Sequence, residues 1–324
     1  MRITNKMITN TYMNNLNKSF ARVNELNEKV TAGRKYLKAS EDPATALKAY
    51  QVRQHLSRIS LYKENVKEVE GLFTEVEACF SSINTILGNV NELLIQGNSG
   101  SHSEDGLKII AENIRNYQEQ LFSVANSNYS GQYIFGGHNM KTIPFTLDSD
   151  GNLYYQGINV NDDPSIFPEE ELFFDIGLGL STTATGQIVP GTALNIAHPG
   201  SEIFGTGIDS EGLSNNYYAL LGQIADLFES GDISDLNKYM AKLDTCIADN
   251  MLNYTNIGQK NNFIDFLKNR FDTDEYNALI KQKNLEGIDP ALGIMEFNMQ
   301  ELSYQSALKM GSKIIQPSLL DYLR

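Results

Sequence analysis

The sequence predicts a mainly α fold, with a long coiled-coil helical rod built from both chain ends and a small β-rich inserted domain. Apolar residues recur at alternating steps of three and four along both ends of the chain, which is the pattern of helices that pack against partner helices. Helical periodicity disappears over residues 132–212, where Gly, Pro, Thr and aromatic residues cluster. No stretch approaches about 18 uninterrupted apolar residues, so the sequence predicts no membrane span.

The first predicted helix carries one apolar stripe and a clear stop signal. The stripe comprises Ile8, Tyr12, Leu16, Val23, Leu26 and Val30, with Ser19 filling the gap. Gly33 follows at a position where a left-handed residue commonly ends a helix. Asp42 and Pro43 then predict a new helix, with Asp42 as the N-cap and Pro43 at the first helical position.

The strongest pattern covers residues 59–94, where the steps of three and four alternate without an error. Its members are Ile59, Tyr62, Val66, Val69, Phe73, Val76, Phe80, Ile83, Leu87, Val90 and Leu94. This 3.5-residue repeat predicts a left-handed supercoil with a partner helix. A helix over 59–94 would span about 54 Å at 1.5 Å per residue, longer than a compact core requires. His55, four residues before Ile59, falls in the same phase.

A third apolar stripe follows a polar, Gly- and Ser-containing segment from Gly97 to Gly106. It comprises Leu107, Ile110, Ile114, Tyr117, Leu121 and Val124. Two stripes in the same alternation, joined by a short loop, predict an antiparallel helical hairpin.

The sequence of the insert, residues 132–212, predicts short strands. Residues 143–147 and 153–156 flank an Asp-Gly turn at Asp148–Asn152, which predicts a β-hairpin. Residues 171–176 form another expected strand.

Helical periodicity returns after Ser214, the expected N-cap of a helix that starts with Tyr217, Leu220, Ile224 and Leu227. A longer helix follows, with its stripe at Leu236, Met240, Leu243, Ile247, Tyr254, Ile257, Ile264 and Phe271. Asn250, Asn261 and Lys268 occupy positions of that stripe, where polar residues can set register and partner choice.

The last predicted helix, about 291–315, carries two apolar stripes and ends before Pro317. One comprises Leu292, Met295, Met299 and Leu302; the other comprises Ile294, Phe297, Tyr304, Leu308 and Ile315, with Glu301 and Gly311 in register. Two stripes on one helix predict at least two packing partners.

Composition and motifs argue against nucleic-acid binding, membrane-surface binding and catalysis. The net charge is −14, the pI is near 4.8, and no run of basic residues is present. The four histidines lack metal-ligand spacing, and Gly131–His138 lacks the Lys-Ser/Thr of a phosphate-binding loop. Asp148–Asn152 supplies only the first ligand positions of an EF-hand loop. The sequence thus predicts no catalytic residue, no cofactor and no metal.

Two further features have structural interpretations. Cys79 and Cys246 lie among helical apolar residues, which predicts buried free thiols; a disulfide between them would require the two helices to meet there. The carboxylate run Glu169–Glu171 predicts a solvated surface loop.

Several segments resemble the flagellar hook-associated protein 3 family, the FlgL-type hook–filament junction proteins of the flagellin-like superfamily. They are the opening Met1–Tyr12, the pair Ala32–Lys35 and Ala39–Ala44, the run Leu121–Asn126 with Gly131–Gly137, the strand-region pairs Pro144–Phe145 and Tyr155–Gly157, and the end Tyr304–Leu308 with Ile314–Leu323. The resemblance covers about residues 1–157 and 285–324. Ile288–Gly293 departs from the pattern, with a Pro and a Gly at the start of the final helix.

The resemblance implies a non-enzymatic, secreted structural subunit of the bacterial flagellum that is exported without a cleavable signal peptide and serves motility. Its expected partners are copies of itself in a ring, the hook-side junction protein (hook-associated protein 1), flagellin and a flagellar export chaperone.

Two alternatives remain open at this point. Flagellin shares the terminal helices, but usually begins Ile-Asn-His-Asn and usually lacks the sequence found here at Gln316–Leu323. A coiled-coil signalling protein would explain the long stripes, but not their presence at both extreme ends.

The expected organisation has three parts. Residues 1–35 and 287–324 form the terminal helices and assembly core, 36–131 and 213–286 the helical rod domain, and 132–212 the β-rich outer domain. The expected subunit-interaction residues are Leu16, Val23, Leu26, Val30, Leu292, Met295, Met299, Leu302, Tyr304, Leu308, Ile315, Leu319, Leu320 and Leu323. We also expect residues 1–33 and about 290–324 to be mobile in the monomer and to order on assembly, because one partner covers only one stripe.

Overall fold

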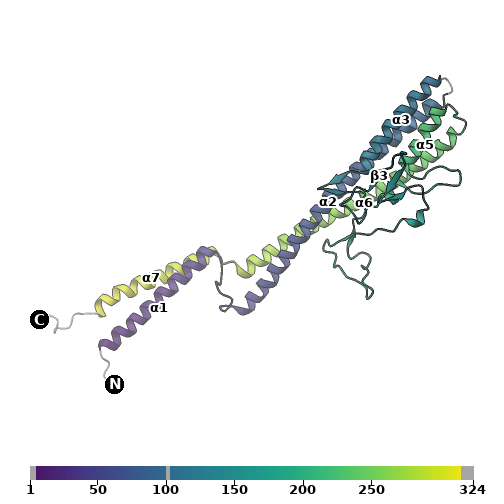
Figure 1. The fold of residues 1–324 in the computed structure, drawn as a ribbon. Helices are drawn as coiled ribbons and strands as arrows, with labels where there is room; N and C mark the ends of the chain where they lie inside the picture. The colour runs from purple at the N-terminus through teal and green to yellow at the C-terminus, as the bar shows by residue number, and fades with distance from the viewer. Residues whose placement is uncertain (1–4, 100–102, 315–324) are drawn as a thin grey trace. The chain divides into compact units, whose positions relative to one another are not determined.

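The computed structural model describes residues 5–99 and 103–314, and it confirms a mainly α fold with small sheets (Figure 1). The longer helices are α1 (Asn5–Ala32), α2 (Pro43–Gly97), α3 (Glu104–Ala125), α5 (Tyr217–Ser230), α6 (Leu236–Glu286) and α7 (Pro290–Ile314). The chain divides into two compact units, one containing the segments up to Ile59 and from Thr273 onward, the other Ser60–Asp272. No helix in the described part of the chain is long and apolar enough to cross a membrane.

Local chemistry sets most of the helix ends as predicted. Gly33 adopts a φ of +65° directly after α1, the left-handed conformation that favours glycine. The Asp42 carboxylate accepts a hydrogen bond from the Thr45 amide at 3.1 Å, so Asp42 is the N-cap of α2.

The N-cap of α5 was predicted at Ser214 and lies two residues later. The Asn216 side chain accepts hydrogen bonds from the amides of Tyr218 and Ala219. Ser214 is buried and its hydroxyl bonds to the Asn161 side chain at 2.6 Å. A serine that is engaged by a distant residue cannot cap the helix, so the next suitable side chain does.

The stripe of α2 forms the centre of the second unit. From Val66 to Leu94 its residues are no more than 2% exposed, as the repeat predicted. Tyr62 is half-buried and its ring stacks on Phe271 of α6, with the centroids 6.0 Å apart. The expected phase of His55 is wrong, because the stripe passes through Leu56 and Val52 while His55 is exposed.

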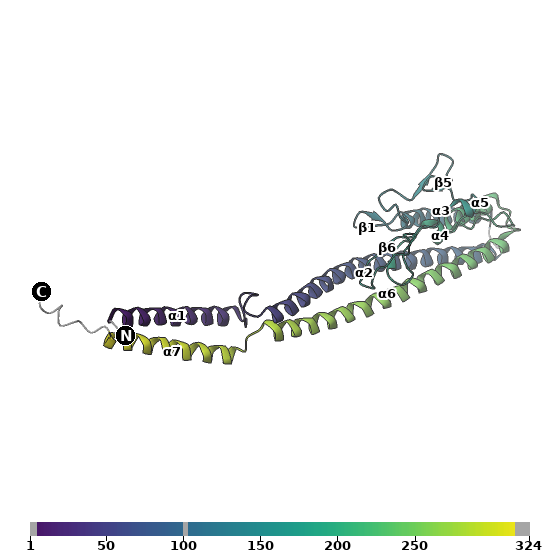
Figure 2. The same ribbon diagram turned by 90° about the horizontal axis from the view of Figure 1, so that it is seen from below.

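Polar residues of α6 meet α2 along this stripe, and the two helices lie side by side in both ribbon views (Figures 1 and 2). The Asn250 amide donates to the Phe80 carbonyl at 3.2 Å, and the Asn261 amide donates to the Glu77 carboxylate at 2.6 Å. Lys268 forms an ion pair with Glu70 at 2.7 Å. Each contact exists in one alignment of the helices only, so together they fix the register.

The segment between α3 and α5 contains three small antiparallel sheets. Their strands are β1 (Asn128–Tyr129) with β2 (Gln132–Tyr133), β3 (Phe145–Leu147) with β4 (Leu153–Tyr155) and β5 (Ile158–Asn159), and β6 (Phe173–Phe174) with β7 (Leu194–Asn195). A 3₁₀ turn, η1 (Pro164–Ile166), and a short helix, α4 (Gly200–Phe204), complete it. The predicted hairpin is confirmed, and the Asp148 carboxylate accepts amide hydrogen bonds across its turn.

An aromatic cluster joins the insert to α2. Phe80 of α2 meets the Phe135 ring edge-on at 6.3 Å, and Phe135 meets Phe204 at 5.1 Å. Phe145 lies 5.2 Å from Phe204 and 5.1 Å from Tyr155. All five side chains are fully buried, so the insert shares a core with the helices.

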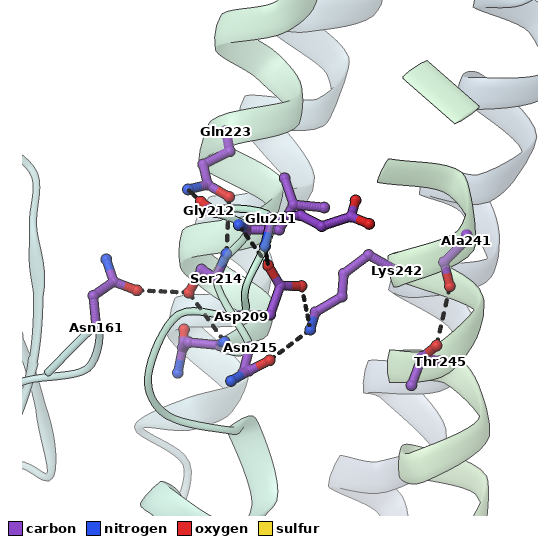
Figure 3. A network of polar contacts seen from close by, with 12 residues as sticks. Asn161, Asp209, Glu211, Gly212, Ser214, Asn215, Gln223, Ala241, Lys242 and Thr245 are labelled. Carbon is purple, nitrogen blue, oxygen red and sulfur yellow. Dashed lines mark hydrogen bonds and ion pairs between the residues drawn. The ribbon is translucent and has the colours of Figure 1, made fainter. Parts of the chain in front are cut away.

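A polar network ties the loop before α5 to α6 (Figure 3). The Lys242 ammonium of α6 contacts the Asp209 carboxylate at 3.0 Å and the Asn215 side-chain oxygen at 2.5 Å. Asp209 also accepts hydrogen bonds from the amides of Glu211 and Leu213. The ammonium holds the pKa of Asp209 below its usual range, through a direct hydrogen bond.

Glu170 corrects the expectation of a solvated carboxylate run. Its neighbours Glu169 and Glu171 are exposed, but Glu170 is buried and accepts a hydrogen bond from the His138 amide at 2.7 Å. Gly137 lies against this carboxylate at a φ of +60°, and a Cβ there would stand 1.5 Å from Oε2. Gly137 therefore makes room for a buried acid.

The two cysteines are both buried and not joined to each other, as the helical context favoured. Burial raises the pKa of the Cys246 thiol to about 11 and also raises that of Cys79. Both thiols are therefore protonated and unreactive near neutral pH.

Candidate subunit-interaction surface

The two ends of the chain form an antiparallel helix pair, α1 with α7 (Figure 2). The Tyr12 hydroxyl donates to the Ala307 carbonyl at 2.9 Å, and the Gln300 amide donates to the Ser19 hydroxyl at 3.0 Å. The Phe20 ring lies 5.5 Å from that of Tyr304. These contacts connect residues more than 280 positions apart in the sequence.

The face that α1 presents is the predicted stripe. Its half-buried positions are Thr9, Tyr12, Leu16, Ser19, Val23, Leu26, Lys29 and Val30. They include four predicted interaction residues, which lie within this intramolecular pair. Ile8, the first member of the predicted stripe, is exposed instead.

The inward face of α7 overlaps the second predicted stripe at Phe297, Glu301, Tyr304 and Gly311, but Ile294 and Leu308 of that stripe are exposed. The inward face comprises Gly293, Phe297, Gln300, Glu301, Tyr304, Ala307 and Gly311. A Cβ on Gly311 would stand 2.1 Å from the Tyr12 hydroxyl oxygen, and one on Gly293 would stand 3.2 Å from a Val30 methyl. Small residues thus let the two helices approach closely.

The outward face of α7 carries large apolar side chains. The predicted interaction residues Leu292, Met295, Met299, Leu302 and Leu308 are between 45% and 65% exposed. Ile294 and Met310 on α7, and Met7 and Met13 on α1, are exposed to a similar extent and were not among the predicted residues. Ile315, Leu319, Leu320 and Leu323 lie outside the described residues. Soluble monomers rarely expose a contiguous apolar surface of this kind.

The segment after α1 contacts the segment before α7. The Lys35 amide donates to the Glu286 carbonyl at 2.8 Å, and the Ile288 amide donates to the Gly33 carbonyl at 3.1 Å. The buried Glu286 side chain forms an ion pair with Arg53 at 2.7 Å. These hydrogen bonds join residues 33–35 to 286–288, and so connect the end of α1 to the start of α7.

Charged side chains also make contacts near the end of α1 and the start of α7. The Lys29 ammonium contacts Glu25 at 2.6 Å and Glu41 at 2.8 Å. Hydrogen bonds to Glu25 and then Glu41 raise the pKa of Lys29, and the bond from Lys29 lowers the pKa of Glu41. Asp289 caps α7 through the Ala291 amide at 2.9 Å, so the departure at Ile288–Gly293 leaves the helix start intact.

The outward face of α7 is suited to binding other proteins through apolar contacts. Within residues 5–99 and 103–314, no group of three or more His, Cys, Asp or Glu side chains is placed to hold a metal ion. The outward face offers aliphatic and thioether groups, which bind other apolar surfaces through the hydrophobic effect.

Comparisons with known proteins match this architecture. Residues 3–140 match the bacterial flagellin N-terminal helical region. The chain is 23% identical to flagellar hook-associated protein 3 of Salmonella typhimurium, over 99% of this chain and 94% of that protein. It is also 23% identical to the protein of that name in Escherichia coli, over 90% of this chain and 85% of the other.

Solved structures show the same fold. A putative flagellar hook-associated protein from Vibrio parahaemolyticus aligns with a TM-score of 0.60 at 16% identity, covering 76% of this chain and all of that one. Flagellar hook-associated protein 3 from Legionella pneumophila aligns with a TM-score of 0.57 at 13% identity, covering 73% of this chain and 98% of the other. The resemblance inferred from the sequence is confirmed: the chain contains a flagellin-type N-terminal helical region and is a relative of flagellar hook-associated protein 3.

Proposed function

We propose that the chain is a structural, non-enzymatic subunit of the bacterial flagellum that joins hook to filament through packing of its terminal helices. The observation that carries the proposal is the outward apolar face of α7, centred on Met295, Met299 and Leu302. One helix partner, α1, already covers the opposite face of α7. The exposed face therefore needs a further partner, and the names of the relatives indicate a flagellar one.

In this proposal, copies of the chain form a ring. Leu16, Val23, Leu26, Val30 and Tyr304 hold α1 and α7 together, while Leu292, Met295, Met299, Leu302 and Leu308 contact neighbouring subunits. Residues 1–35 and 287–324 act as the assembly core, 36–131 and 213–286 as the rod domain, and 132–212 as the outer domain.

The proposed neighbours are hook-associated protein 1 on the hook side and flagellin on the filament side. An adaptor between two different assemblies needs more than one binding face, and α7 has two. We further propose that the subunit is exported without a cleavable signal peptide, with a flagellar export chaperone covering the apolar face beforehand.

The order of the ends in the free subunit stays a prediction. In the structure α1 and α7 pair with each other, yet one face of α7 remains in water. Limited proteolysis of a verified monomer should trim both ends and leave a core of about 40–285. Resistance of both termini would contradict ordering on assembly, as would restored motility with the trimmed chain.

Immuno-electron microscopy on detached flagella tests the proposed function directly. We expect a single band of label at the hook–filament boundary, and loss of filament attachment when the gene is deleted. Label along the whole filament would instead identify the chain as flagellin.

A further inference from the structure

A polar cleft of about 530 Å³ lies between the β-rich insert and α6. One wall comes from residues 195–203, the other from residues 253–263 of α6, with Phe80 at the base. Four side-chain amides line it: those of Asn195, Asn253, Asn256 and Gln259. The proposed role in assembly makes no use of this cleft.

Lys260 places a cation in the cleft without a carboxylate partner. Its ammonium makes one long hydrogen bond, 3.4 Å to the Asn195 carbonyl, and lies 5.6 Å from the centre of the Phe73 ring. No ion pair joins it to an acid in the part of the chain that the structure describes. Burial lowers the pKa of Lys260, which reflects the cost of desolvating an unpaired ammonium.

Lys242 on the same helix shows what a paired lysine looks like here. Its ammonium contacts both Asp209 and Asn215 (Figure 3). A buried cation is ordinarily paired in this way, because its charge is costly to remove from water. Lys260 is also largely buried, but no carboxylate pairs with its ammonium in the described part of the chain.

His198 adds a second unused polar group to the same cleft. Its side chain is only 6% exposed, its ring meets Phe73 edge-on at 5.6 Å, and its Nε2 has no hydrogen-bond partner among the described residues. Lys260 and His198 therefore flank the same phenyl ring. Burial and then the Lys260 charge lower the pKa of His198 to about 3.

We propose that this cleft binds a carboxylate at the Lys260 ammonium, beside the buried His198 ring, with the amides of Asn253, Asn256 and Gln259 along its wall. A carboxylate supplies the counter-ion that Lys260 lacks. Glu202 is exposed and also lines the cleft, and its repulsion is weaker for a singly charged carboxylate than for a doubly charged phosphate.

The site can be tested on the full chain by following histidine ring signals in NMR spectra. The sequence has four histidines, so the His198 signal is assigned with a His198→Gln variant. At pH 7, sodium acetate should shift this signal saturably, while sodium chloride at equal ionic strength should not. Absence of a saturable shift, or an equal response to chloride, would overturn the proposal.

Lys260→Gln should weaken acetate binding at least tenfold. Lys238→Gln is the matched control, because Lys238 is an exposed lysine on the same helix and the change removes the same charge. Unchanged binding by the Lys260 variant would contradict the assignment. Should that variant fail to fold, acetate must still raise the melting temperature of the unmodified chain above that in chloride.

Two further ligands distinguish a protein side chain from a small molecule as the source of the carboxylate. A blocked hexapeptide with one central glutamate is compared with its glutamine counterpart and with acetate. Binding tenfold tighter than acetate, lost in the glutamine peptide, assigns the site to an acidic side chain of a protein segment. Equal affinity for acetate and peptide assigns it to small carboxylates. Binding of inorganic phosphate without binding of acetate would overturn the carboxylate assignment.

Discussion

The helical core around α2 and the terminal pair of α1 and α7 follow the same seven-residue alternation, yet they bury very different side chains. The α2 stripe from Val66 to Leu94 is composed of large apolar residues and is closed to water. The inward face of α7 is composed largely of glycine, alanine, glutamine and half-buried aromatics, and its large apolar residues point outward.

Periodicity alone therefore does not say which face of a helix is internal. In the α2 core the apolar face and the intramolecular face coincide. In the terminal pair they are separate, so the chain satisfies one face itself and leaves the other for a partner. Changes to single residues can test this separation.

The largest effect is expected in the α2 core. Phe80→Ala should lower the free energy of unfolding by about 3–5 kcal/mol, because it leaves a cavity beside the buried Phe135 ring. Phe20→Ala on α1 is the matched control and should cost less than about 1 kcal/mol, since half of that side chain is exposed. Urea unfolding followed by circular dichroism measures both, and equal costs would remove the distinction between the regions.

The second effect depends on pH and belongs to the buried core. The pKa of His198 is about 3 in the folded chain against about 6.5 when unfolded, so the unfolded state binds a proton that the folded state excludes. Stability from this group is complete above pH 6.5 and is lost as the pH falls toward 3. The loss between pH 7.5 and pH 5.5 should be about 1.4 kcal/mol.

Urea unfolding at the two pH values, in a buffer without carboxylates, measures this loss. His198→Phe should abolish that part of the pH dependence. His55→Gln, at an exposed position, should leave it in place. A pH dependence that survives in the His198 variant would show that another group causes it.

A smaller effect is expected within the terminal pair. Gly311→Leu should separate α7 from α1, because the new side chain occupies the position of the Tyr12 hydroxyl. We expect faster amide hydrogen exchange in both terminal helices, by roughly the fivefold that 1 kcal/mol confers. Ser306→Leu, on the exposed side of α7, should not accelerate exchange. Accelerated exchange in the core around α2 would contradict a local effect.

The smallest effect on stability is expected at the outward face. Met299→Glu combined with Leu302→Glu should change the free energy of unfolding by no more than about 0.5 kcal/mol, because both side chains are exposed in the subunit. The same variant should fail to restore filament attachment in a deletion strain. Replacing the exposed Asn298 and Ser303 by Glu is the control and should restore attachment. If a strain carrying the Met299→Glu, Leu302→Glu variant is motile, the outward face of α7 is not needed for the proposed assembly.

Sequence patterns predicted the helices well because the long stripes are strict. The α2 stripe and the α1 stripe were both found, and Gly33 and Asp42 marked the boundaries between them. His55 was placed in the wrong phase because a step of four and a step of three both fit before Ile59. The three-part division of the chain remains a proposal.

The remaining features depend on tertiary contacts that no local pattern records. Only part of the inward face of α7 was predicted, because Gly293, Gln300 and Ala307 are not apolar signals in a periodicity search. Glu170 lies in a run of acids, and only its fold neighbours bury it. The cleft at Lys260 and His198 combines segments about 60 residues apart, so no local pattern indicates it.

The row of polar contacts between α2 and α6 has a mechanical consequence. Asn250, Asn261 and Lys268 bond to partners spaced along α2, so sliding one helix past the other breaks all three contacts at once. The three contacts therefore share a force applied along the helices. A force that peels the helices apart loads and breaks the contacts one at a time. In a subunit proposed to join two assemblies, this helix pair resists pulling along the helices better than peeling.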